Sequence, residues 1–184
     1  MSVSQAAQAA TLVQVLHSQA EVRNRLGLPF VEDREPPTPP AEGQLRFWSP
    51  NWTGAHVLAE ATKLGLTVTE TEKVRHRGCC QHPIDAGYYT VPLHPPTCGT
   101  GKFRKSDRLK PGEVHAPLNI VLMAALLRYA IDIEDYCPGV WLATADKVDD
   151  KVVCVMINDG TVTVELHDPR LVATNGHATA VMLV

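Results

Sequence analysis

The chain has 184 residues and a formal net charge of −3, from 17 Lys and Arg against 20 Asp and Glu. Hydrophobic residues make up 45% of it, an ordinary share for a globular protein that excludes a chain disordered throughout. No apolar run approaches the roughly 18 residues that a membrane-spanning helix needs, so we expect no such helix. The length suits one domain with a sizeable core, with or without an appendage.

Residues 1–27 are predicted to form an N-terminal helical arm. Apolar residues recur at intervals of three or four through residues 2–26, and Gly27 stands where a helix commonly ends. The segment lacks the pattern of a secretory signal, because no basic residue precedes Arg23 and glutamines interrupt the apolar positions. We therefore expect a protein of the cytoplasm or of an assembled particle, whose cysteines are reduced or bind metal.

A proline-rich linker is predicted over residues 28–44, which hold five of the 14 prolines. Proline fixes φ and lacks a backbone donor, so this stretch is expected to be extended. Residues 45–184 then form the predicted domain. Its first elements are expected to be a strand at 45–48, a helix at 54–64 capped by Thr53, and strands at 66–74 and 88–93.

The most apolar segment, residues 120–127, is predicted to lie in a helix that begins at Pro117 and is buried on every face. From residue 140 onward the hydrophobic period changes to two. Strands are predicted at 140–145, 152–157, 161–166, 170–174 and 178–183, joined by Asn- and Gly-containing turns. The predicted fold class is therefore α+β, with the helical arm and a central buried helix packed on a C-terminal antiparallel β-meander. The apolar C-terminus either completes a sheet or is covered by another subunit.

An irregular, Cys- and His-rich basic insertion is predicted at about 75–114. The chain has five cysteines and eight histidines. Seven of these residues lie in the insertion or, in the case of His115, directly after it. Zinc binds four thiolate or imidazole ligands and can organise a loop that has few apolar residues. The candidate ligands of a structural zinc are Cys79, Cys80, His82, His94 and Cys98. The alternatives are solvated histidines with buried thiols, a disulfide such as Cys80–Cys98, or a catalytic metal.

The same region concentrates positive charge. Residues 73–110 contain eight basic and two acidic residues, a net charge of +6, whereas the rest of the chain has nine basic and 18 acidic residues, a net charge of −9. The candidate polyanion-binding residues are Lys73, Arg75, Arg77, Lys102, Arg104, Lys105, Arg108 and Lys110. Such a patch attracts phosphate backbones or acidic protein surfaces, unless the chain's own acids neutralise it in solvent.

A catalytic interpretation uses the same cysteines. Cys79 or Cys80, His115 and Asp132 follow the chain order of some Cys-His-Asp hydrolases. However, no nucleophile motif, HExxH sequence or dinucleotide-binding glycine pattern accompanies them. A Cys/His-dependent or metal-dependent hydrolase is therefore the alternative hypothesis.

The favoured hypothesis is a non-enzymatic binding or assembly protein. It would be a structural subunit of a larger particle, virion-like or another multi-subunit complex, and would form oligomers. Its expected partners are other protein subunits, bound through the N-terminal arm and the apolar C-terminal strand. The basic loop, stapled by zinc, would contact nucleic acid or an acidic partner, and no membrane partner is expected.

Overall fold

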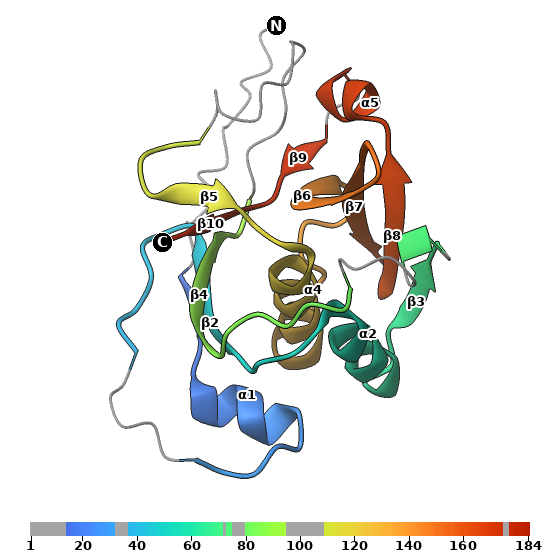
Figure 1. Cartoon of the computed structure of the whole chain (residues 1–184). Coiled ribbons are helices and arrows are strands. Elements are labelled where there is room, and N and C mark those ends of the chain that lie inside the picture. The colour runs from blue at the N-terminus through green and yellow to red at the C-terminus, as the bar shows by residue number, and fades with distance from the viewer. Residues whose placement is uncertain (1–13, 32–36, 72, 75–79, 95–108, 175–176) are drawn as a thin grey trace, which may run out of the picture.

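The structure is a computed structural model of the 184-residue chain, and it describes residues 14–31, 37–71, 73–74, 80–94, 109–174 and 177–184. The fold is mixed α/β and contains two five-stranded sheets (Figure 1). Sheet 1 has, in spatial order, the strands β1 (Val15–His17), β2 (Gln44–Ser49), β4 (Gly87–Pro92), β10 (Val181–Leu183) and β5 (Glu113–His115). Sheet 2 has the strands β3 (Thr67–Glu70), β8 (Thr161–His167), β7 (Lys151–Asn158), β6 (Trp141–Val148) and β9 (Ala178–Thr179). Among the described residues, no helix combines the length and the apolar character needed to cross a membrane.

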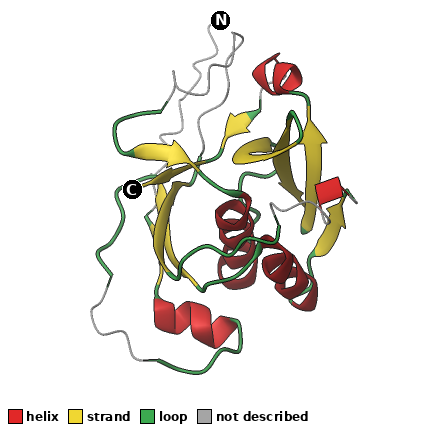
Figure 2. Cartoon of the chain, in the orientation of Figure 1, coloured by secondary structure: helices red, strands yellow, loops and turns green. Residues whose placement is uncertain are grey.

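The predicted central helix is confirmed as α4 (Leu118–Leu127), and all ten of its residues are buried. It lies between the two sheets (Figure 2) and contacts β2 on one side and β6 and β7 on the other. The helix is extended by a π-helical turn, η1 (Arg128–Asp132). Asn119, the polar residue of α4, donates hydrogen bonds to two backbone carbonyls, so its burial leaves the amide satisfied.

The first turn of α4 obtains its cap from a distant strand. Pro117 precedes the helix and offers no side-chain cap, whereas the carboxylate of Asp146 on β6 accepts a hydrogen bond from the backbone N–H of Leu118 at 2.6 Å. A negative charge at a helix N-terminus is favourable because the backbone N–H groups there lack partners within the helix. Asp146 thus fixes the buried helix to sheet 2.

The N-terminal helix is shorter than predicted. Helix α1 spans Gln19–Arg25, and Ser18 caps it by accepting a hydrogen bond from the backbone N–H of Glu21. The prediction of a helix through residues 15–17 is wrong, because those residues form β1 and pair in parallel with β2. The apolar period there is equally compatible with a short edge strand, and tertiary pairing decides between the two. Residues 1–13 of the predicted arm lie outside the described part of the chain.

Most strands and helix α2 agree with the sequence pattern. Helix α2 (Gly54–Lys63) begins after Thr53, whose hydroxyl accepts a hydrogen bond from the backbone N–H of His56 at 3.1 Å. Strands β6, β7 and β8 form the first three strands of the predicted five-stranded antiparallel meander, with a tight Asp159-Gly160 turn between β7 and β8. Both turn residues have positive φ, which Asp and Gly tolerate.

The last predicted strands differ from the structure. Residues 170–174 were expected to be a strand but belong to helix α5 (Pro169–Thr174). Asp168 directly before it accepts a hydrogen bond from the backbone N–H of Arg170, and proline is favoured at the first helical position. Hydrogen bonds from Arg170 hold the pKa of the Asp168 carboxyl down to about 2. The capping of α5 by Asp168 therefore outweighed the short alternating pattern that favoured a strand at 170–174.

The C-terminal segment changes sheets. Strand β9 pairs in parallel with β6 in sheet 2, and β10 then lies between β4 and β5 in sheet 1, antiparallel to both. Ala180 joins the two strands, with its N–H donating to the carbonyl of Ala143 and its carbonyl accepting from the N–H of Ala116. The apolar C-terminus thus completes a sheet, which is one of the two outcomes predicted for it.

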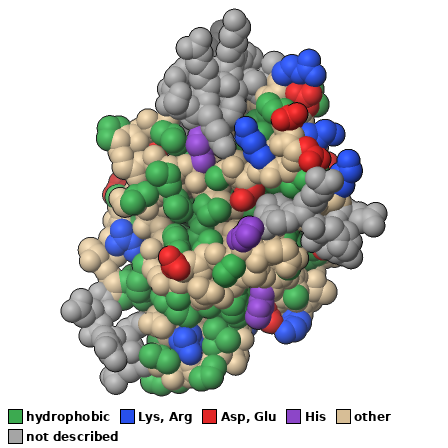
Figure 3. Space-filling view, viewed as in Figure 1, with side chains coloured by type: hydrophobic (Ala, Val, Ile, Leu, Met, Phe, Trp, Pro, Cys, Tyr) green, Lys and Arg blue, Asp and Glu red, His purple; other side chains and the backbone are tan. Residues whose placement is uncertain are grey.

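Hydrophobic and charged side chains gather on different parts of the surface. Figure 3 shows hydrophobic side chains gathered over the side of the molecule formed by β4, β10 and β5, and charged side chains gathered near α5 and β8. Val114 on β5 and Val184 at the C-terminus are the exposed apolar residues at this edge of sheet 1, with 36% and 90% of their surface accessible.

Tyr136 and Cys137, which follow η1 in the chain, are hydrogen-bonded to the end of β4. The hydroxyl of Tyr136 donates to the carbonyl of Pro92 at 2.8 Å, and the thiol of Cys137 donates to the carbonyl of Leu93 at 3.3 Å. Burial raises the pKa of Cys137 to about 12, although the nearby Arg128 guanidinium acts in the opposite direction. Burial likewise raises the pKa of Tyr136 well above its ordinary value.

We predict that Asp146→Ala lowers the free energy of unfolding by about 1–2 kcal/mol, because the substitution removes the cap of α4. Urea denaturation followed by circular dichroism measures the change. Glu42→Ala, at an exposed carboxylate in the turn before β2, is the control and should change stability by less than about 0.5 kcal/mol. Equal effects of the two substitutions would contradict the capping role.

We predict that stability falls as the pH rises from 9 to 10, in part through Cys137. The unfolded thiol loses its proton near its ordinary pKa of 9.0, whereas the folded thiol holds its proton up to about pH 12. The native state then binds more protons, so the free energy of unfolding decreases with pH. Urea titrations at pH 8, 9 and 10 should show a shallower decrease for Cys137→Ser than for the wild type. Parallel curves for the two proteins would show that Cys137 does not contribute.

Candidate metal centre

A cysteine and two histidines meet on the outer face of sheet 2. On β7, Val153 and Val155 point into the main core, and Cys154 therefore faces the opposite side of the sheet. Cys154 is paired with Glu165 of β8, and His167 follows two residues later on the same face. The third residue, His177, stands directly before β9.

The three side chains could hold a metal ion. One ligand atom from each of Cys154, His167 and His177 lies within 4.8 Å of the others, and we call these three residues the Cys154 centre. Nδ1 of His167 is 2.8 Å from Nε2 of His177. Two imidazole nitrogens at this distance either share one proton as a hydrogen bond or coordinate one ion.

A tetrahedral zinc would require the three ligand atoms to move. Zinc–nitrogen bonds of about 2.0 Å and a zinc–sulfur bond of about 2.3 Å place neighbouring ligand atoms about 3.3–3.6 Å apart. The two imidazole nitrogens, at 2.8 Å, would separate by about 0.5 Å, and a pair at the 4.8 Å limit would approach by about 1.2 Å.

A carboxylate lies on the outer side of the His167 ring. Oε2 of Glu165 is 3.4 Å from Nε2 of His167, whereas Nδ1 of the same ring faces His177. Metal-binding histidines commonly donate their second ring N–H to a carboxylate, which fixes the ring orientation and makes the coordinating nitrogen more basic. Glu165 is thus placed to orient His167.

The surroundings of the centre are closed and aromatic. Cys154 is fully buried, His177 is 4% exposed, and the side chain of His167 is 14% exposed. The Trp141 ring lies 4.4 Å from the His167 ring, centroid to centroid, and Val172 of α5 packs in the small apolar cluster that contains Cys154. Nucleophilic cysteines are usually partly exposed and activated, so this burial favours binding over covalent catalysis.

The metal ligands predicted from the sequence are only partly described. Cys79 and Cys98 lie outside the described residues. Cys80 is fully buried in the main core, and its backbone carbonyl accepts a hydrogen bond from Ala55. His82 and His94 are exposed. The predicted zinc staple in this loop therefore stays a prediction.

The residues of the hydrolase alternative are distributed over the fold. Cys79 is outside the described residues, and Cys80 is buried in the main core. His115 lies on β5 before α4, and Asp132 ends η1. Because α4 and η1 are continuous, Asp132 is about 20 Å from the start of α4 at the normal helical rise. His115 and Asp132 thus stand at opposite ends of the continuous α4–η1 helix, and the triad as a whole stays a prediction.

Most of the candidate polyanion-binding residues lie outside the described part of the chain. Lys73 and Lys110 are described and exposed. The other six, Arg75, Arg77, Lys102, Arg104, Lys105 and Arg108, lie outside the described part of the chain.

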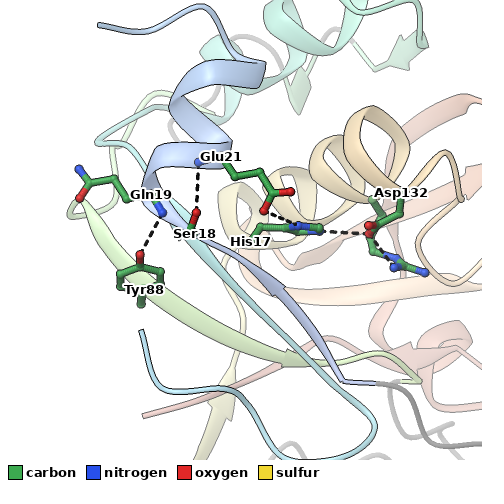
Figure 4. A network of polar contacts seen from close by, with 7 residues as sticks. His17, Ser18, Gln19, Glu21, Tyr88 and Asp132 are labelled. Carbon is green, nitrogen blue, oxygen red and sulfur yellow. Dashed lines mark hydrogen bonds and ion pairs between the residues drawn. The ribbon is translucent and has the colours of Figure 1, made fainter. Parts of the chain in front are cut away.

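A second polar cluster connects the N-terminal segment to the end of the central helix. Figure 4 shows His17, on β1, between Glu21 and Asp132. Nε2 of His17 is 3.1 Å from the Asp132 carboxylate, which also accepts a hydrogen bond from Arg128 at 2.6 Å. Nδ1 of His17 is 3.5 Å from the Glu21 carboxylate, which is too long for a good hydrogen bond. This cluster attaches edge strand β1 to η1.

Part of the Cys154 centre could have been found from the sequence. The Asp159-Gly160 turn fixes a register in which Cys154 is paired with Glu165, so that His167 must lie on the face of Cys154. His177 had no comparable signal, because its position depends on helix α5 and on a parallel pairing between β9 and β6.

Known proteins offer no further guide. No protein-family model matches the chain, and neither a curated protein nor a solved structure matches it. A function must therefore be inferred from the geometry and chemistry of the chain's own side chains.

Proposed function

We propose that the protein is a non-enzymatic binding and assembly protein whose C-terminal sheet carries a structural zinc ion at the Cys154 centre. The observation that carries this proposal is the convergence of three ligand atoms within 4.8 Å on one face of sheet 2. The spacing of cysteines and histidines predicts a zinc ion in the loop at about 75–114, whereas the ion proposed here lies on sheet 2.

The donor set favours zinc over the hard cations. One thiolate and two imidazoles suit zinc and the other borderline or soft metals, whereas calcium and magnesium take oxygen ligands. The described residues supply three of the four ligands of a tetrahedral ion. Glu165 then acts on the ion indirectly, through the ring of His167.

A structural role agrees with the position of the centre. Its residues come from β7, from β8 and from the segment before β9, so that one ion would join three parts of the chain. The free energy of metal binding then adds to that of folding, because the unfolded chain has no preformed site. The burial of Cys154 supports this role over a catalytic one.

The proposed contacts with other subunits and with polyanions lie away from the Cys154 centre. Strand β5 is the last of the described strands of sheet 1, and the exposed Val114 and Val184 lie at the same end of the sheet. Exposed apolar side chains favour contact with another protein subunit. The basic residues between Lys73 and Lys110 would contact nucleic acid or an acidic partner, with a steep dependence on salt.

Metal analysis of the purified chain tests the zinc site. We expect about one equivalent of zinc in the wild type by plasma mass spectrometry, and its loss in Cys154→Ala and in His177→Ala, since each removes one ligand. Matched controls are Cys137→Ala and His56→Ala, which remove a thiol and an imidazole elsewhere and should retain zinc. Circular dichroism verifies that each variant is folded.

Two results would contradict the proposal. A folded wild type that takes up no zinc when the ion is supplied would exclude the site. Retention of a full equivalent by Cys154→Ala, with loss in His94→Ala, would instead place the metal in the loop before residue 114.

A further inference from the structure

The C-terminal eight residues take part in both sheets. His177 belongs to the Cys154 centre, β9 pairs with β6 in sheet 2, and β10 is an interior strand of sheet 1. Three backbone hydrogen bonds secure this segment at its turns and its end. Ala180 donates to Ala143 at 3.0 Å, Ala116 donates to Ala180 at 2.9 Å, and Val184 donates to Gly112 at 2.9 Å.

Sheet 1 depends on this segment for its continuity. Strand β10 separates β4 from β5, and β5 pairs with no other described strand. If β10 left its position, β4 would become an edge with unpaired N–H and C=O groups, and β5 would lose its partner. The segment thus determines whether sheet 1 has five joined strands.

Helix α5 comes before this segment in the chain. Helix α5 has six residues, too few for intrinsic stability, and Leu171 within it is half exposed. Val172 packs in the small apolar cluster, and β9 contributes two residues to sheet 2. The contact between the His167 and His177 rings adds to this packing, to the strand pairing of β9 and β10, and to the backbone hydrogen bonds named above.

We propose that a metal ion at the Cys154 centre locks residues 177–184 in place, so that with the ion bound β9 and β10 open together, and expose the β4 edge of sheet 1, less often than without it. The lock rests on the proposed function. The ion would bind Cys154 and His167 on strands β7 and β8, which remain in the sheet, and His177 on the segment that moves. Metal state would then control an edge that is suited to strand addition by another chain.

Amide hydrogen exchange on the full-length wild type tests the lock, with zinc-loaded protein compared with chelator-treated protein. The amides to follow are those of Ala116, Ala180 and Val184, which are the donors named above. If opening of the segment abolishes binding, free zinc at 100 times its Kd should slow their exchange about 100-fold. The amide of Val57 in α2, which donates to Thr53, is the internal reference and should be unchanged.

A pair of variants separates the lock from general stabilisation. In His177→Ala, which lacks the ligand on the segment that moves, added zinc should give no added protection to Ala180 and Val184. His56→Ala should behave as the wild type. Zinc-dependent protection of these amides in His177→Ala would overturn the lock.

The two proposals fail in different ways. If the wild type binds zinc but the three amides exchange no more slowly than without it, the lock is wrong and the zinc site stands. If the wild type binds no zinc, the proposed function itself is wrong.

Discussion

The burial of α4 on every side is the constraint on which the rest of this fold depends. A helix that is apolar around its whole circumference cannot face water, so it must be covered from all directions. Sheet 1, sheet 2 and α2 provide that cover, and Asp146 satisfies the N-terminal end of the helix. The two sheets cover the helix from opposite sides, and the chain passes between them repeatedly. The last passage is at the C-terminus, where β9 belongs to sheet 2 and β10 to sheet 1.

The elements that could be predicted are those whose local pattern and tertiary environment agree. The apolar run of α4, the Thr53 cap of α2 and the Asp159-Gly160 turn each specify one structure through side-chain chemistry alone. The failures occur where a short pattern is ambiguous. Residues 15–17 became a strand because β2 offers an edge to pair with, and residues 170–174 became a helix because Asp168 caps it.

The candidate site was harder to predict because its residues are distant in sequence. Spacing rules favour clusters such as Cys79 to Cys98, whereas Cys154, His167 and His177 come together through strand register and a change of sheet. The hairpin register places Cys154 and His167 on one face. The position of His177 follows only from the parallel pairing of β9 with β6, which no local pattern encodes. The outer face of sheet 2 could therefore carry a metal centre that sequence spacing does not reveal.

X-ray absorption at the zinc edge tests the central claim most directly, because it counts the sulfur atoms bound to the metal. A zinc at the Cys154 centre should show one sulfur at about 2.3 Å, with nitrogen ligands at about 2.0 Å. A zinc held by the loop cysteines and histidines would show two sulfurs, one from Cys79 or Cys80 and one from Cys98. A first shell with two or more sulfurs, or with oxygen and nitrogen alone, would contradict the site described here.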